Sequence, residues 1–266
     1  MSEAPGAAWW GKWHLELGET RFWRVGPLEL WVERRRHEWL IRRRRSGDPM
    51  DSALEVATER TPPEDDASLE IDRVAGEETD GRLTLSPRLA DRAVIVRPRS
   101  PFHALEGAKV DLFVSSPLWV RVATGPDGDL DLLDLPTHRP SDTWFGANTL
   151  TGHKAYAVSA SCRVDLEGLP VRPHRAVTPL RIKNPGPGAL DFVRIAVPVP
   201  NLSLYAGEGG RLWTETLKLT RRDDNHGVAD AEVQAGAPAQ AGESQLVAPP
   251  REVAGTRILR VFDTLF

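Results

Sequence analysis

The chain has 266 residues, a formal net charge of −4 and a single cysteine, and 40% of its residues are hydrophobic. A chain of this length can bury a sizeable core, as one large β domain or two smaller ones, so stability requires neither a metal nor a disulfide. One cysteine excludes an intramolecular disulfide and is typical of a reducing compartment, and we therefore expect a cytoplasmic protein.

Hydropathy gives no indication of a membrane protein. No apolar stretch approaches the length of about eighteen residues that a transmembrane helix needs. Residues 1–13 lack the basic start and apolar core of a secretion signal. We therefore expect no membrane span and no secretion.

Charge is distributed unevenly along the chain. Residues 1–45 carry ten Lys or Arg against six Asp or Glu, a net charge of +4, whereas residues 46–80 carry two against twelve, a net charge of −10. The runs Arg34–Arg36 and Arg42–Arg45, interleaved with tryptophans, have the ingredients of a nucleic-acid surface. Because the next segment supplies the opposite charge and the whole chain is acidic, we interpret these runs as neutralised by their acidic neighbour. The sequence thus argues against a nucleic-acid partner.

Period-two alternation predicts strands in the N-terminal block, residues 1–45. Apolar and polar residues alternate from Trp13 to Leu17 and from Leu28 to Val32, and Trp39 with Ile41 follow after a polar stretch. We expect a β-meander of about three strands here.

Residues 46–80 contain too little apolar surface to form a core of their own. We therefore predict a flexible acidic connector, with one short strand near Leu54–Val56.

The following block, residues 81–252, shows short apolar runs separated by Pro and Gly every eight to twelve residues. This pattern is typical of an antiparallel β-sandwich, immunoglobulin-like or jelly-roll-like, and no alternating amphipathic helices indicate an α/β sheet. The predicted strands are Ala93–Val96, Lys109–Val114, Leu118–Ala123, Leu130–Leu135, Ala155–Leu166, Ala176–Lys183, Leu190–Val197 and Arg211–Thr220.

The tail, residues 253–266, changes period. Ile258, Phe262 and Leu265 stand at i, i+4 and i+7, which places them on one face of a helix. We predict a short C-terminal helix that docks on an otherwise all-β protein.

Catalytic and metal motifs are incomplete in this chain. His37-Glu38 begins like a zinc-protease helix, but Ile41 stands where the second histidine belongs, and no nucleotide-binding glycine loop or G-x-S-x-G elbow occurs. We expect no metal and no cofactor, although distant histidines such as His138, His153 and His174 can converge in space. Cys162 lies on the apolar side of a predicted strand, which favours a buried, inert thiol.

One long connection is predicted between two strands. Residues 136–154 show neither helical nor strand periodicity, and connections of this length inside a compact domain are often functional. The alternative is a structural plug for an open end of the sandwich. The candidate binding residues of this loop are Arg139, Asp142, Thr143, Trp144, Phe145 and His153.

Several short motifs stand out in the second half of the chain: Ser116–Val120, Pro136–Gly146 with its run Ser141–Gly146, Pro198–Pro200, Leu204-Tyr205 and Leu212–Thr214. Together they resemble a prokaryotic family known as domain of unknown function 432. The similarity covers about residues 90–220 and implies a shared fold, but it transfers no catalytic residue.

The sequence favours a non-enzymatic protein-binding or scaffolding module whose recognition surface includes the loop 136–154. Edge strands of an open sandwich also make a homodimer plausible. The alternative is a hydrolase or metal-dependent enzyme in which His138, Arg139, Asp142 and His153 converge. Carbohydrate or nucleic-acid binding through the tryptophans and the arginine-rich hairpin is a weaker alternative.

Overall fold

The computed structural model describes residues 8–58, 60–63, 66–98, 102–146, 152–158, 162–192, 194–222, 228–252, 257–260 and 262–263. This part of the chain consists of strands and three single-turn 3₁₀ helices, which confirms the all-β prediction. None of these helices is long and apolar enough to cross a membrane.

The chain divides into two compact units, each assembled from separate segments. The first contains residues 1–88, 118–139 and 172–174, and the second contains residues 89–117, 140–171 and 175–266.

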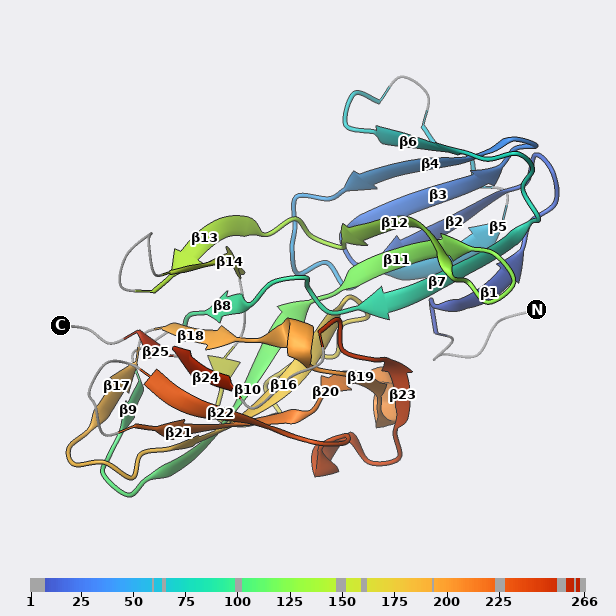
Figure 1. Ribbon diagram of the computed structural model, residues 1–266. Coiled ribbons are helices and arrows are strands. Elements are labelled where there is room, and N and C mark those ends of the chain that lie inside the picture. Colours follow the sequence, from blue (N-terminus) through green and yellow to red (C-terminus); the bar gives the residue numbers. More distant parts are fainter. Residues whose placement is uncertain are drawn as a thin grey trace. The chain divides into compact units, whose positions relative to one another are not determined.

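The first unit is a sandwich of two sheets (Figure 1). One sheet has the order β1-β7-β11-β12, with β1 (Gly11–His14), β7 (Arg82–Arg88), β11 (Trp119–Thr124) and β12 (Leu130–Pro136). The other has the order β5-β2-β3-β4-β6, with β2 (Thr20–Val25), β3 (Leu28–Arg34), β4 (Glu38–Arg45), β5 (Leu54–Thr58) and β6 (Glu70–Ala75).

Alternation along the strands explains why these two sheets pack face to face. Trp23 of β2 pairs with Leu30 of β3, and both belong to a buried cluster with Leu85 of β7 and Val120 of β11. Their neighbours Phe22 and Trp31 pair with each other on the opposite face of the five-stranded sheet. The core therefore draws on residues from both the N-terminal block and the later strands.

Residues 46–80, for which the sequence predicted a flexible connector, contain two edge strands. β5 covers the short strand expected near Leu54–Val56, and β6 pairs with β4 from Glu38↔Ala75 to Arg43↔Glu70. Arg43 forms ion pairs with Glu70 and Asp72 of this edge strand. Cross-strand charge pairing thus supports strands whose apolar content is low.

The second unit is built around the long strand β16 (Arg175–Lys183), which confirms the strand predicted at Ala176–Lys183. The nine-stranded sheet has the order β23-β19-β20-β16-β21-β22-β24, with β10 pairing both β15 and β16. Its other strands are β10 (Lys109–Pro117), β15 (Cys162–Arg163), β19 (Leu204–Ala206), β20 (Leu212–Thr214), β21 (Thr216–Arg221), β22 (Val228–Gln234), β23 (Gln245–Ala248) and β24 (Arg257–Arg260).

Two smaller sheets complete this unit. The five-stranded one has the order β13-β14-β8-β18-β25, with β8 (Val94–Val96), β13 (Ser141–Phe145), β14 (His153–Ala157), β18 (Arg194–Val197) and β25 (Phe262–Asp263). The two-stranded one joins β9 (Phe102–Ala104) and β17 (Leu190–Phe192). The 3₁₀ helices are η1 (Val199–Asn201), η2 (Glu208–Gly210) and η3 (Ala239–Ala241). Most pairings are antiparallel, but β8–β14, β16–β20 and β16–β21 are parallel.

The C-terminal helix predicted for residues 253–266 is wrong. The described part of this tail forms β24, which pairs with β22, and β25, which pairs with β18. Ile258 lies opposite Asp230 and Phe262 lies opposite Ile195, so pairing with strands far away in the sequence determines the conformation of the described part of the tail. Leu265, the third residue of the predicted helical stripe, lies outside the described residues.

Candidate functional site

The connection predicted at residues 136–154 is not an irregular loop, and this is a second correction. Residues 136–154 contain the end of β12, all of β13 and the start of β14. β13 and β14 form an antiparallel hairpin in which Asp142 lies opposite Tyr156 and Trp144 opposite Lys154. The candidate residues are therefore held on strands, where alternation fixes the face to which each one projects.

One face of this hairpin is buried. Phe145 is 4% exposed and packs with Ile95, Ala155 and Ala196 in a small core cluster. The Arg194 guanidinium lies 5.7 Å from the centre of the Phe145 ring. Phe145 thus anchors β13 in the second unit.

The opposite face carries the exposed residues, and we call Asp142, Trp144, Lys154 and Tyr156 together with Arg92 the hairpin face. Trp144 is 44% exposed although the next residue of the strand, Phe145, is buried. Arg92 forms an ion pair with Asp142 at 2.9 Å and lies 5.2 Å from the centre of the Tyr156 ring. The result is an aromatic side chain surrounded by groups of both charges.

Tyr156 is held in place on the hairpin face by burial and by a hydrogen bond. Burial, and then its hydrogen bond to Asp91 at 2.8 Å, raise the pKa of Tyr156 to about 12. The phenol therefore stays protonated and donates to Asp91 at physiological pH. This bond orients the tyrosine ring below Arg92.

Two of the remaining candidates lie on the other side of the hairpin. Thr143 is half-buried opposite Ala155, and His153 lies opposite Phe145, so both project to the other side of the hairpin from Asp142. Arg139 is exposed and belongs to the first unit.

The three histidines considered as a cluster are also divided between the units. His138 and His174 belong to the first unit and His153 to the second. His174 is buried, with its Nε2 atom 3.1 Å from the carbonyl oxygen of Pro49. Among the residues that the structure describes, no group of three or more His, Cys, Asp or Glu could hold a metal ion. Burial raises the pKa of the Cys162 thiol to about 11, which disfavours a reactive thiolate.

The arginine-rich strands β3 and β4 are paired with acids. Trp31 and Trp39 are 1% and 3% exposed, so neither presents a face for stacking. Arg34 donates to the Leu15 carbonyl at 2.8 Å. The other arginines of the two runs form the ion pairs Arg35–Glu33, Arg36–Glu78, Arg42–Glu33, Arg43–Glu70, Arg43–Asp72, Arg44–Glu29, Arg44–Asp66 and Arg45–Glu70. Four of these acids, Asp66, Glu70, Asp72 and Glu78, come from the acidic segment.

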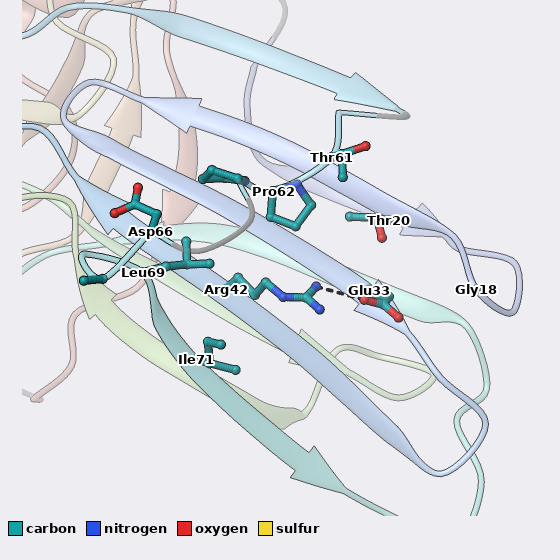
Figure 2. A pocket seen from close by; sticks show the side chains of 11 residues that line it. Gly18, Thr20, Glu33, Arg42, Thr61, Pro62, Asp66, Leu69 and Ile71 are labelled. Atoms are coloured by element: carbon teal, nitrogen blue, oxygen red, sulfur yellow. Dashed lines mark hydrogen bonds and ion pairs between the residues drawn. The ribbon is translucent and has the colours of Figure 1, made fainter.

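A pocket of about 760 Å³ lies on the same sheet. Residues 60–63 and 66–69, which we call the strap, connect β5 to β6 and contribute part of its wall (Figure 2). Arg42 and Glu33, joined at 2.9 Å, line it from the sheet, and Pro62 and Leu69 line it from the strap. A pocket of this size is in the range that binds small organic molecules.

The family model described as Protein of unknown function (DUF432) matches residues 9–266. The chain belongs to the DUF432 family. The searches of curated proteins and of solved structures found no match.

Sequence reasoning missed the pocket of this DUF432 protein because it treated residues 46–80 as a connector. A signal was present: Leu69 and Ile71 alternate with the charged residues Glu70 and Asp72, as on a half-buried strand. The adjacent Thr61-Pro62-Pro63 indicated a stiff turn rather than a flexible tether.

Proposed function

We propose that this DUF432 protein is a non-enzymatic module that binds a protein partner through the hairpin face, in the reducing cytoplasm. The observation that carries the proposal is Trp144, which stands 44% exposed on a strand whose next residue is buried. Tryptophan is among the residues that contribute most binding free energy to protein interfaces. Because Trp144 is already held on a strand, binding a partner costs this protein little conformational entropy.

The surroundings of Trp144 favour a protein over a small ligand. Asp142 and Lys154 offer one acid and one base beside the ring, and Arg92 offers a second cation. Protein interfaces typically have aromatic residues at the centre and polar or charged residues at the rim. β13 is also the last strand in the order of its sheet, so an extended segment of a partner, or of a second copy, can add to it.

We propose no enzyme at this hairpin. An enzyme there would need Asp142 and His153 to act on one substrate, but the register directs them to opposite faces. Nucleic-acid binding through the arginine-rich strands is disfavoured as well, since their cations already pair with carboxylates and their tryptophans are buried.

Affinity purification from the native host tests the proposal. The tagged wild-type chain is compared with the double variant Trp144→Ala, Asp142→Ala and with Leu246→Ala, a matched control because Leu246 is also exposed on an edge strand of the second unit. We expect a protein that is enriched by the wild type and by Leu246→Ala but lost with the double variant.

Two results would contradict the proposal. One is recovery of the same partners by the double variant. The other is retention of polysaccharide or single-stranded nucleic acid by the wild type, with no protein enriched over untagged controls, which would assign Trp144 to a different ligand class.

A further inference from the structure

We propose that the pocket on the five-stranded sheet binds an apolar monocarboxylate, with Arg42 as the anion-binding residue. The pocket lies in the first unit, whereas the hairpin face lies in the second, so this inference is independent of the proposed function. It rests on three features: a held strap, an arginine with spare donors and an exposed apolar wall.

The strap is fixed to the outer face of the sheet near both ends. Arg60 lies 4.3 Å from the centre of the Phe22 ring, and Asp66 forms an ion pair with Arg44 at 2.8 Å. Phe22 and Trp31 beneath it are buried although they face away from the sandwich core. These contacts place the described residues Arg60 and Asp66 of the strap against the outer face of the sheet, beside the pocket.

Arg42 has N–H donors beyond the one that bonds Glu33. A guanidinium carries five N–H groups, and in the described part of the chain Arg42 uses one of them, from Nη1 to Glu33 at 2.9 Å. Glu33 also accepts a bond from Arg35 at 2.7 Å, so its charge is shared between two arginines. The other N–H groups of Arg42 can donate to one carboxylate of a ligand.

The rest of the lining defines the class of ligand more closely. Pro62, Leu69 and Ile71 form an apolar wall, and Ile71 is 57% exposed, which leaves apolar surface for a ligand to cover (Figure 2). Glu33 and Asp66 also line the pocket, so its charge is mixed, and this disfavours a ligand with several negative charges, such as a nucleotide, more than a ligand with one. An apolar body with a single carboxylate satisfies both conditions.

Isothermal titration calorimetry of the full chain with octanoate tests the inference, with octylamine and inorganic phosphate as comparison ligands. We expect saturable 1:1 binding of octanoate and no comparable binding of the other two. Arg42→Gln should weaken octanoate binding about tenfold or more, because a charge-assisted hydrogen bond is lost. Arg73→Gln, which removes an exposed arginine outside the pocket on β6, should leave binding unchanged.

A second pair of variants protects the test against misfolding of Arg42→Gln. Ile71→Glu places a carboxylate at the exposed wall and should weaken octanoate binding severalfold, whereas Leu54→Glu at an exposed position of edge strand β5 should not. Binding should also persist in the Trp144→Ala, Asp142→Ala variant. The inference is overturned if octanoate does not bind, if octylamine binds equally well, or if neither Arg42→Gln nor Ile71→Glu weakens binding.

Discussion

Gly26 occupies a position that no other residue fits without strain. Its φ is +57°, and a Cβ atom there would lie 2.2 Å from Nδ1 of the buried His174. Gly26→Ala therefore combines an unfavourable backbone conformation with a steric clash, and should lower the free energy of unfolding by about 2 to 4 kcal/mol. Urea denaturation followed by circular dichroism measures this loss.

Gly18 is the matched control for that substitution. Its φ is also positive, at +83°, but no atom lies within 4 Å of the added Cβ. Gly18→Ala should cost only the backbone term, about 1 kcal/mol. Equal losses for the two variants would show that the contact between Gly26 and His174 is not formed.

Phe145 and Trp144 are adjacent aromatic residues with opposite roles. Phe145 is buried in the cluster with Ile95 and Ala155, so Phe145→Ala should cost about 3 to 5 kcal/mol of unfolding free energy. Trp144→Ala should cost less than about 1 kcal/mol, because its ring is largely outside the core. Denaturant titration of both variants compares them, and a larger loss for Trp144→Ala would mean that the hairpin has the opposite register.

The strap should loosen in acid because of Asp66. Hydrogen bonds from the Ser68 hydroxyl and backbone N–H, followed by the pairing with Arg44, lower the pKa of Asp66 from 3.8 to about 2. A lowered folded-state pKa means that the unfolded chain binds the proton more tightly. The stabilisation is therefore fully present above about pH 4 and lost as the pH falls towards 2.

Comparison of the wild type with Asp66→Asn isolates this titration. The urea midpoint of the wild type should exceed that of the variant above pH 4, and the difference should shrink towards zero near pH 2. Other carboxylates with lowered pKa values, such as Glu33 and Glu70, are present in both proteins and cancel in the difference. A difference that does not change with pH would exclude a role for the ionised Asp66 in holding the strap.

Long strands could be predicted from the sequence, whereas short ones could not. β10 and β16 have nine residues each and were predicted near their observed positions. In β13 the exposed Trp144 occupies a position where alternation calls for a polar residue, and this concealed the strand. β24 and β25 have four and two residues, too few to separate a strand period from a helical one.

The candidate site was predicted in part. The sequence identified Trp144, Asp142 and Phe145 as candidate binding residues. Only the pairing of β13 with β14 shows that Trp144 and Asp142 lie on the exposed face and Phe145 on the buried face. Arg92 and Tyr156 join the hairpin face through contacts between residues far apart in the chain, so local patterns could not associate them with it.

At the scale of the whole molecule, the N-terminal strands depend on later segments. The core of the first unit includes Leu83, Leu85, Val120, Val122 and Leu135, which lie on β7, β11 and β12. Each such side chain contributes about 1.5 to 3 kcal/mol when buried, and together they are comparable with the whole stability of a typical domain. Residues 1–80 expressed alone should therefore not fold cooperatively.

Thermal melting by circular dichroism and amide dispersion in NMR spectra test this expectation, with the full chain as control. A cooperative transition and native-like dispersion for residues 1–80 would show that the meander is an autonomous domain.

Site-specific photo-crosslinking tests the central claim, that a protein partner binds the hairpin face, most directly. A photoreactive residue at position 154, opposite Trp144, is compared in the native host with one at the exposed position 246 of the same unit. The proposal predicts a covalent adduct with one defined protein from position 154, lost when Trp144→Ala is added, and no such adduct from position 246. No adduct from position 154, or the same adduct from both positions, would contradict it.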